Sequence, residues 1–167
     1  MKKVVSDTGP VLHLREAGLA HLLELAGRVH IPKAVNLELE RLDAAWGRAR
    51  PAWVSLIELT EGYRREALAW QQAGLLGPGE SEAIALARQV GADWLLTDDA
   101  PARLVARSLG LDVHGSLGVV LWAAAVGHVG RSDAEAALAR LMQSSLWMSA
   151  RVVGEARAAL RQLFEQT

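Results

Sequence analysis

The fold of this chain is decided by Gly77-Pro78-Gly79-Glu80-Ser81-Glu82 and by Trp94-Leu95-Leu96-Thr97-Asp98-Asp99, two short sequences separated by an alanine-rich run. The first favours the start of a helix, because proline in the first helical turn gives up no backbone hydrogen bond. Apolar residues at helical spacing continue this helix to Val90, and Gly91 is placed to end it. The second sequence begins as a short buried strand over residues 94–96. The stretch is therefore predicted to be one helix-to-strand unit.

This unit carries acidic side chains at both of its ends. Glu80 and Glu82 fall in the first helical turn, where the helix dipole stabilises negative charge. Asp98 and Asp99 follow the strand directly. In an open parallel sheet, helix N-termini and the carboxyl ends of strands lie along the same edge, where ligands bind. We therefore expect these carboxylates to converge.

On either side of this unit, short apolar strands alternate with helices. Strands are predicted at residues 3–6, 29–31, 53–59 and 111–113. Helices are predicted at residues 11–26, 33–47, 62–73, 100–109 and 116–126, and a capping box at 132–135 and an N-cap at Ser149 start two more. This alternation predicts an α/β sandwich with a mainly parallel sheet. No linker divides the chain, so we expect one domain over residues 1–167, with the C-terminal helices from about residue 116 packed on it.

The composition excludes several classes of protein. No apolar run approaches the roughly 20 residues that a membrane span needs, so no membrane partner is expected. Asp7 interrupts the apolar segment that follows the positive N-terminus, which argues against a signal peptide. Since the chain has no cysteine, disulfides and thiolate metal sites are excluded and a cytoplasmic location is expected. The formal net charge of −1 gives no global attraction to nucleic acid.

Three other residue types were weighed as site candidates. Six tryptophans are scattered along the chain, and we expect them to pack in the core or in interfaces rather than to stack on bases. The five histidines show no metal-ligand spacing and are expected at the surface or in packing positions. Several arginines could form a local basic patch, namely Arg48, Arg50, Arg64, Arg65, Arg103 and Arg107.

Acidic residues occupy corresponding places in several predicted units. Asp7 ends the first strand, and Glu38 lies in the first or second turn of the helix at 33–47. Taken singly, an acid in such a place is more often a turn residue, an N-cap or a dipole partner than a site residue. Their common position at one predicted edge of the sheet, together with the acids of the central unit, favours a joint site.

Four carboxylates at one edge would repel each other strongly in a low-dielectric cleft. Cations stabilise such a cluster, and hard oxygen ligands without cysteine or paired histidine indicate Mg²⁺ or Mn²⁺. One or two such ions can activate a water, hold phosphate oxygens and stabilise a leaving oxygen. The acids therefore indicate phosphodiester hydrolysis.

These motifs, in this order, resemble those of the PIN domain family, and more narrowly an uncharacterised PIN-like branch related to the VapC toxins. The resemblance is carried by Val5-Ser6-Asp7-Thr8-Gly9-Pro10, residues 31–39, residues 79–87, residues 96–103 and Gly115-Ser116-Leu117-Gly118. Each motif alone is weak, but their order and spacing are specific and cover nearly the whole chain. The resemblance implies a three-layer α/β/α fold with a parallel sheet, and a Mg²⁺- or Mn²⁺-dependent ribonuclease site of four acids.

The resemblance also assigns the four catalytic acids, which are Asp7, Glu38, Glu80 and Asp99. Glu80 is preferred to Glu82 because it lies third into its helix, although the family often has Asp there. Asp99 is preferred to Asp98 on its spacing from Thr97, whereas the spacing from Glu80 suits Asp98. Glu82 and Asp98 therefore stay as alternates.

The same resemblance implies roles for these residues. Asp7 would ligate the principal metal ion, with Asp99 or Asp98 helping directly or through water. Glu38 and Glu80 would complete the cage or orient the attacking water.

Three further residues could support the acids. Ser6 and Thr97 could hold the carboxylates in place. Arg103, one turn after Asp99, could meet a phosphate or pair with an acid.

The leading hypothesis is a metal-dependent endoribonuclease acting on RNA, in its more specific form the toxin of a toxin–antitoxin pair that a cognate antitoxin protein holds inactive. Family members commonly form homodimers, and Trp122 and Trp147 offer surface for one. The alternative is a catalytically weak or inactive binding or regulatory module, which the lack of a basic surface and the Glu at position 80 favour. The absence of Asp-x-Asp after the first strand argues against a phosphatase, and the absence of Gly-x-Gly-x-x-Gly argues against dinucleotide binding.

Overall fold

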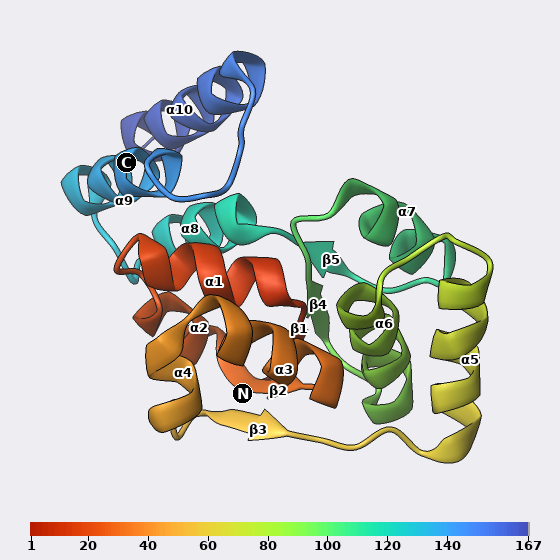
Figure 1. Ribbon diagram of the computed structural model, residues 1–167. Helices are drawn as coiled ribbons and strands as arrows, with labels where there is room; N and C mark the ends of the chain where they lie inside the picture. Colours follow the sequence, from red (N-terminus) through yellow and green to blue (C-terminus); the bar gives the residue numbers. More distant parts are fainter. Residues whose placement is uncertain (167) are drawn as a thin grey trace.

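The computed structural model describes residues 1–166, and a parallel sheet of five strands forms its centre (Figure 1). The strands are β1 (Lys2–Ser6), β2 (Gly27–Ile31), β3 (Val54–Leu56), β4 (Trp94–Leu96) and β5 (Val113–His114). Their order across the sheet is β3-β2-β1-β4-β5, and every neighbouring pair is parallel. The expected domain runs to residue 167, which lies outside the described residues.

Apolar side chains make β1 the centre of the sheet. Val4 and Val5 are completely buried, and Val4 is in register with Val29 on one side and with Trp94 on the other. A strand buried on both faces has a continuous apolar sequence, as parallel strands between two helical layers do. Leu95 in β4 follows the same pattern.

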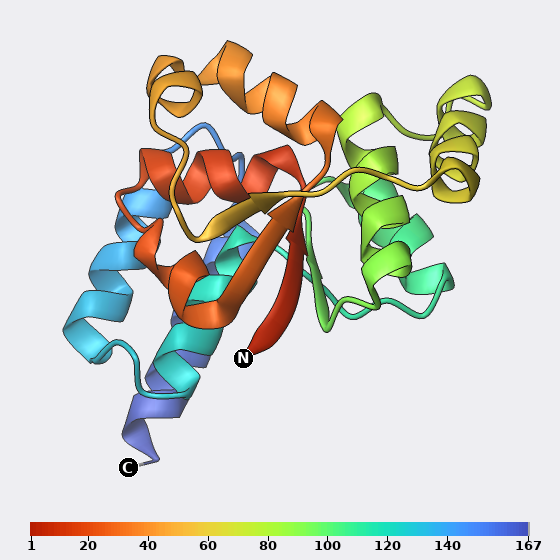
Figure 2. The same cartoon turned by 90° about the horizontal axis from the view of Figure 1, so that it is seen from below.

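Helices cover both faces of the sheet, as the two views at right angles show (Figures 1 and 2). They are α1 (Thr8–Glu16), α2 (His21–Ala26), α3 (Lys33–Leu42), α4 (Ala44–Arg48), α5 (Glu61–Gln72), α6 (Pro78–Val90), α7 (Ala100–Ser108), α8 (Ser116–Ala125), α9 (Arg131–Met142) and α10 (Ala150–Glu165). The predicted three-layer α/β/α arrangement is confirmed. In the central unit, Gly91 ends α6 in the left-handed conformation, with φ of 60°.

The helix expected at residues 11–26 is wrong in one respect, because two helices replace it. Gly18 adopts a φ of 71°, a conformation that favours glycine, and this ends α1 before α2 begins. The Leu19 N–H then bonds the Leu14 carbonyl oxygen at 2.7 Å, which closes the turn. The apolar stripe runs through both helices, so hydrophobic spacing alone could not show the break.

The helix expected at residues 33–47 is also divided, at Asp43. This residue is extended, and its Oδ1 accepts the Ala45 N–H at 3.0 Å, so it caps α4. Its Oδ2 accepts Arg15 Nε at 2.9 Å, and this contact fixes the break against α1.

The capping box expected at residue 132 is wrong, because the N-cap of α9 is Gly130, two residues earlier. Ser132 therefore lies inside the helix. Ser149 does cap α10, where its hydroxyl oxygen accepts the Val152 N–H at 3.2 Å. The strands expected at 53–59 and 111–113 are present as the shorter β3 and the shifted β5.

The C-terminal helices share a small apolar cluster. Its buried members come from α8, α9 and α10, and are Ala124, Ala134, Leu138, Ala156 and Leu160. α8 in turn contacts α1 and α2. Within residues 1–166, no helix is both long enough and apolar enough to cross a membrane.

The strand order positions a ligand site. The chain proceeds from β1 to β2 and β3 on one side, then crosses to β4 and β5 on the other, so the direction of winding reverses between β1 and β4. Ligands of such sheets bind outside the carboxyl ends of the strands at this reversal. The two strands remain joined there, since the Asp7 N–H donates to the Leu96 carbonyl oxygen at 2.8 Å.

Candidate functional site

Asp7 lies directly after β1, and only 4% of the residue is exposed. Its Oδ1 accepts the Thr8 N–H at 2.7 Å, which caps α1, and its Oδ2 accepts the Thr97 hydroxyl at 2.9 Å. The Ser6 hydroxyl donates instead to the Asp7 carbonyl oxygen at 2.9 Å. Of the two expected supporting residues, Thr97 therefore contacts the carboxylate and Ser6 contacts the backbone.

Glu38, on α3, joins the first turns of two other helices. Its Oε2 accepts the Thr8 hydroxyl at the start of α1, and its Oε1 accepts the Gly79 N–H at the start of α6, at 3.1 Å. A Cβ atom at Gly79 would lie 2.5 Å from Glu38 Oε2 and 2.7 Å from Oε1. Glycine at position 79 therefore makes room for this carboxylate.

Glu80 and Glu82, which the sequence left as alternates, diverge in the structure. Glu80 lines the same cavity as Asp7. Glu82 lies instead near the start of α3: burial raises its pKa, and the Ala34 backbone N–H and the charge of Arg64 oppose that rise.

Asp99 lies after β4 and is the N-cap of α7. Its Oδ2 accepts the Ala102 N–H at 2.9 Å, and its own N–H donates to the Thr97 hydroxyl oxygen at 3.2 Å. The Thr97 hydroxyl therefore contacts both Asp7 and Asp99. This arrangement fixes the first and fourth predicted acids to one another across β1 and β4.

Both carboxylate oxygens of Asp98 accept hydrogen bonds from neighbouring groups. Its Oδ1 accepts the Ser116 N–H at 2.7 Å, and its Oδ2 accepts the Ser116 hydroxyl at 2.5 Å and lies 2.7 Å from His13 Nδ1. Burial alone would raise the pKa of Asp98, but hydrogen bonds from His13 and Ser116 hold it below its usual value. Asp98 therefore belongs to a cluster with His13 and Ser116.

The electrostatics link the remaining acids. Burial, followed by the negative charge of Glu80 and more weakly that of Glu38, raises the pKa of Asp7 from 3.8 to about 7, although the bonds from Thr8 and Thr97 oppose the rise. Burial also raises the pKa of Glu80, and the charges of Asp99 and Glu38 add to the effect. These four carboxylates therefore act on one another, as like charges in a partly buried site do.

A cavity of about 330 Å³ lies over these groups. Asp7, Glu80, Asp98 and Asp99 line it together with His13, and the segment that joins α9 to α10 forms its outer wall through Ser145, Leu146 and Trp147. The motifs predict the acids at this edge, whereas the position of the C-terminal segment over them depends on tertiary packing.

The carboxylates fit a hard divalent cation in their chemistry, because all the donors are oxygens and their mutual repulsion would be relieved by positive charge. Within residues 1–166, however, no three Asp, Glu or His side chains are placed closely enough to hold a metal ion. Protein donors explain this spacing: Glu38 is bound by Thr8 and Gly79, and Asp99 by the N-terminus of α7.

Three site residues were missed by sequence reasoning. Thr8 binds Glu38, Ser116 binds Asp98, and His13 lines the cavity, a place that the expectation of surface or packing positions did not single out. Thr8 and Ser116 lie within the motifs used for the resemblance, so their position was available as a signal. His13 gave none, because its partner Asp98 is 85 residues away in sequence.

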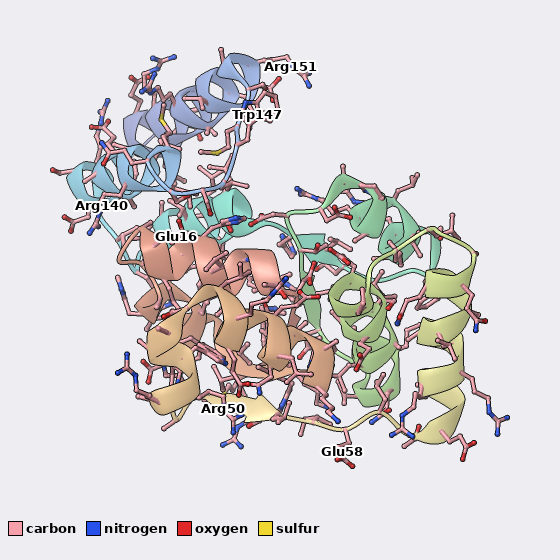
Figure 3. The ribbon with its side chains drawn as sticks, in the orientation of Figure 1. Glu16, Arg50, Glu58, Arg140, Trp147 and Arg151 are labelled. Carbon is pink, nitrogen blue, oxygen red and sulfur yellow. The ribbon has the colours of Figure 1, made fainter. Side chains whose placement is uncertain are left out.

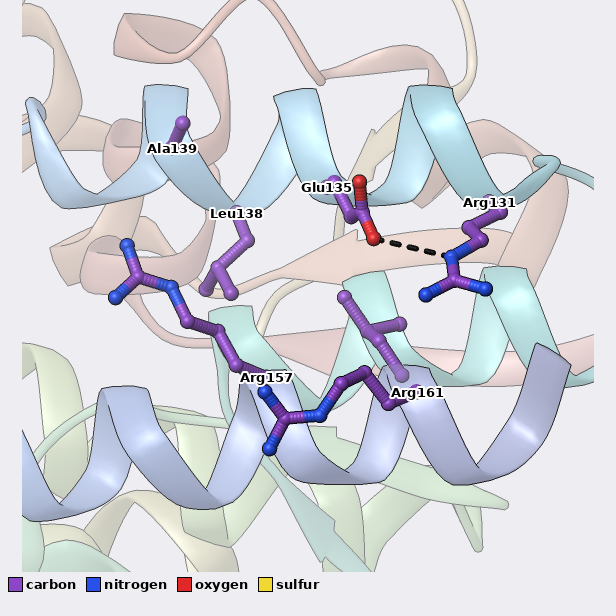
Figure 4. A pocket seen from close by; sticks show the side chains of 7 residues that line it. Arg131, Glu135, Leu138, Ala139, Arg157 and Arg161 are labelled. Atoms are coloured by element: carbon purple, nitrogen blue, oxygen red, sulfur yellow. Dashed lines mark hydrogen bonds and ion pairs between the residues drawn. The ribbon is translucent and has the colours of Figure 1, made fainter. Parts of the chain in front are cut away.

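The arginines are arranged differently from the expected patch. Arg103 lies beside Gly115, where a Cβ atom would be 3.2 Å from its Nη1, and it makes no ion pair with the described acids. A cavity of about 300 Å³ between α9 and α10 is instead lined by Arg131, Arg157 and Arg161, with Arg131 paired to Glu135 (Figure 4). None of these three was among the expected patch residues.

Packing within the chain is confirmed for five of the six tryptophans, and for the sixth, Trp147, interface packing stays a prediction. Trp46 and Trp94 are buried, Trp53, Trp70 and Trp122 are half-buried, and Trp122 meets Trp94 edge-on at 5.4 Å between ring centroids. Trp147 is 82% exposed.

Comparisons with known proteins give the family. Among solved structures, the chain is similar to VapC20 from Mycobacterium tuberculosis, described as a sarcin-ricin loop cleaving toxin, with a TM-score of 0.48 and 18% sequence identity over 61% of this chain and 94% of that one. No curated protein sequence matches. A family model described as PIN domain matches residues 3–162. This chain therefore belongs to the PIN domain family, a family of nucleases.

Proposed function

We propose that this protein is a Mg²⁺- or Mn²⁺-dependent endoribonuclease. The observation that supports the proposal is the convergence of Asp7, Glu80 and Asp99, from three separate elements, in one cavity at the point where the sheet reverses. Glu38 lies close enough to raise the pKa of both Asp7 and Glu80. Buried carboxylates that destabilise one another have the ligand chemistry of a hard divalent cation.

In this proposal Asp7, Asp99 and Glu80 hold the ion, and Glu38 stabilises the arrangement through its bonds to α1 and α6. Bound Mg²⁺ or Mn²⁺ would supply the positive charge that polarises a phosphate and lowers the pKa of a water. Thr97 keeps Asp7 and Asp99 at a fixed separation, because its hydroxyl bonds to both.

We assign Asp98 a positioning role rather than the metal-ligand role that the resemblance left open. Both of its oxygens are already bonded to Ser116, and one of them also faces His13. Oδ2 of Asp98 has two partners, whereas each carboxylate oxygen of Asp7 has one, so a cation at Asp98 would displace more contacts than one at Asp7.

The proposal is tested by titrating Mn²⁺ into the purified protein in a calorimeter and by incubating the same protein with labelled single-stranded RNA. Stoichiometric binding and internal cleavage of the RNA are expected in wild type, and both are expected to be lost in Asp7→Asn. Glu80→Gln and Glu82→Gln form a matched pair on one helix. The first should lose binding and cleavage, while the second should retain both.

Two results would contradict the proposal. One is the absence of Mn²⁺ binding at millimolar concentration by a wild-type protein that thermal unfolding shows to be folded. The other is an equal loss of cleavage in Glu80→Gln and Glu82→Gln, since only Glu80 lines the cavity.

A catalytically weak or inactive binding module is the second candidate. The observation that favours it is the spacing of the acids, which brings no three of them together around one point within residues 1–166. The net charge of −1 also gives no general attraction for RNA. RNA binding without cleavage in the assay above would support this candidate.

The family resemblance supports three further proposals, which are a cognate antitoxin protein, a homodimer and a cytoplasmic location. An adjacent reading frame encoding a small protein that co-purifies with this chain would support the first. Light scattering on the purified protein tests the second. We also propose that residues 1–167 form one domain, because the match to the family model spans most of them.

A further inference from the structure

Trp147 stands apart from the other tryptophans of the chain. It lies in the segment that leads into α10 (Figure 3), and it is 82% exposed. Tryptophan is highly buried on average, so Trp147 is an unusual tryptophan, and the cavities beside it decide whether it has a role.

The residues on either side hold Trp147 in this position. Leu146 and Met148 are half-buried and pack against the main core. The carboxylate of Glu16, on α1, accepts the Ser145 N–H at 3.0 Å and the Ser145 hydroxyl at 2.6 Å. The segment is therefore bonded to α1, the helix that Asp7 caps. The indole of Trp147, between its two packed neighbours, is not part of the core.

Trp147 also forms part of the wall between two cavities. The first is the 330 Å³ cavity of the acids. The second, of about 530 Å³, is lined mainly by apolar side chains, including Leu117, Leu121 and Val152, and it also contains Arg103. Asp98, Leu146 and Trp147 line both cavities, so the two cavities adjoin one another.

We propose that the second cavity is a nucleobase subsite, in which Trp147 stacks on a base of single-stranded RNA and Arg103 contacts a phosphate of the same strand. The inference rests on the proposed ribonuclease function and adds to it a base-binding subsite beside the acids. A sequence-tolerant single-strand site combines an aromatic face with a cation that follows the backbone. Here the aromatic face is exposed, and the guanidinium has no carboxylate partner among the described residues.

The position of Arg103 favours RNA over a protein partner. An apolar interface would bury the Arg103 charge without a partner, which is costly, whereas a phosphate supplies the matching charge. Because the acid cavity adjoins this one, a neighbouring phosphate of the same strand would lie toward Asp7 and Asp99. A single strand is required, because the bases of a duplex are stacked on one another and have no free face.

The test measures RNA affinity separately from cleavage. Fluorescence anisotropy is recorded with a short labelled single-stranded RNA of mixed sequence, in Ca²⁺ in place of Mn²⁺, and a gel shows that the RNA remains intact. Trp147→Ala should weaken binding by about 5- to 150-fold, the range for losing one base–aromatic stack. Trp147→Phe should restore most of the affinity. Leu25→Ala should have no effect. Leu25 is 46% exposed on α2, which leads into the amino end of β2, whereas the acids lie at the carboxyl ends of the strands.

Two further readouts separate stacking from charge. Trp147→Ala should have no effect on an abasic oligonucleotide of the same length, and it should leave the salt dependence of binding unchanged, because stacking releases no counterions. Arg103→Gln should instead reduce the slope of log affinity against log salt by about 0.7, the value for one phosphate of a single strand.

The failures are distinguishable. If wild type binds and cleaves RNA while Trp147→Ala binds it equally well, the subsite is overturned and the ribonuclease function stands. If wild type neither binds nor cleaves RNA, both proposals fail. If Trp147→Ala leaves RNA affinity intact but converts a dimer to a monomer in light scattering, Trp147 belongs to a protein interface and the inference is wrong.

Discussion

The Thr97 hydroxyl donates to Asp7 Oδ2 at 2.9 Å, although the two residues are 90 positions apart in sequence. The same hydroxyl oxygen accepts the Asp99 N–H at 3.2 Å. One buried side chain therefore connects the carboxyl ends of β1 and β4, the two strands between which the direction of winding reverses. This contact makes the ionisation of Asp7 depend on a residue that carries no charge.

Thr97→Val removes this hydroxyl while keeping the shape of the side chain. The hydrogen bond from Thr97 favours the ionised form of Asp7, so its loss should raise the Asp7 pKa above about 7. Carboxyl-carbon NMR during a pH titration measures this pKa directly, and Mn²⁺ affinity at neutral pH should fall in parallel. An unchanged Asp7 pKa in a folded Thr97→Val protein would contradict the assigned contact.

The pH dependence of stability follows from the raised pKa of Asp7. Because the folded protein holds this proton up to about pH 7 and the unfolded chain releases it near pH 3.8, unfolding releases a proton between these values. The free energy of unfolding should therefore fall as pH rises from about 4 to about 7, and then level off. The full effect of such a shift is about 4 kcal/mol.

Asp7→Asn removes this titration, because the amide stays neutral. Urea unfolding of both proteins between pH 4 and pH 8 should show the variant gaining stability relative to wild type as pH rises. Adding Mn²⁺ should stabilise wild type alone, since only the ionised carboxylate binds a cation. Parallel stability profiles for the two proteins would show that Asp7 titrates at its ordinary pKa.

Most of the fold was predictable because its signals are local. The glycine–proline start of α6, the left-handed Gly91 and the apolar run of β4 all act within a few residues, and the structure confirms each of them. The break at Gly18 was not predictable in this way, because the hydrophobic stripe continues across it. The order of the strands could not be predicted from the sequence either, since it depends on which strands pair over long sequence distances.

The acids were predictable to the level of an edge but not of a contact. Topology alone brings Asp7 and residues 97–99 to the reversal of the sheet. The choice between neighbouring acids depends on partners far away in sequence, such as His13 for Asp98. Trp147 was expected to pack, and only the tertiary structure shows that its neighbours Leu146 and Met148 take the buried positions.

Gly79→Ala separates stability from function. The added methyl group would lie 2.5 Å from Glu38 Oε2, so the carboxylate must move away from the Gly79 N–H and the Thr8 hydroxyl. Alanine favours a helix over glycine by about 1 kcal/mol, which offsets part of the lost contacts. We expect thermal stability close to wild type, with RNA cleavage reduced.

Gly154→Ala is the matched control for this change, because a Cβ atom at that helical glycine meets nothing within 4 Å. It should leave cleavage unchanged. Full cleavage by Gly79→Ala would show that the position of Glu38 has no part in the reaction.

Asp98→Asn and Asp99→Asn should have opposite consequences, although the residues are adjacent. Asparagine is as good an N-cap as aspartate, so Asp99→Asn should keep α7 and the stability of the protein, while losing a charge that faces the cavity. Asp98→Asn places an amide N–H₂ among the Ser116 N–H, the Ser116 hydroxyl and His13. The bonds to Ser116 and His13 then involve a neutral amide in place of a carboxylate, which weakens them at a cost of about 1–3 kcal/mol.

The two variants are compared by urea unfolding and by Mn²⁺ calorimetry. Asp98→Asn should lose stability at neutral pH, and its deficit should shrink below about pH 4, because the lowered pKa of Asp98 stabilises the fold only while the carboxylate is ionised. Asp99→Asn should keep its stability and lose Mn²⁺ affinity. The reverse result, with Asp99 needed for stability and Asp98 for metal binding, would exchange the roles of the two acids and make Asp98 the ligand.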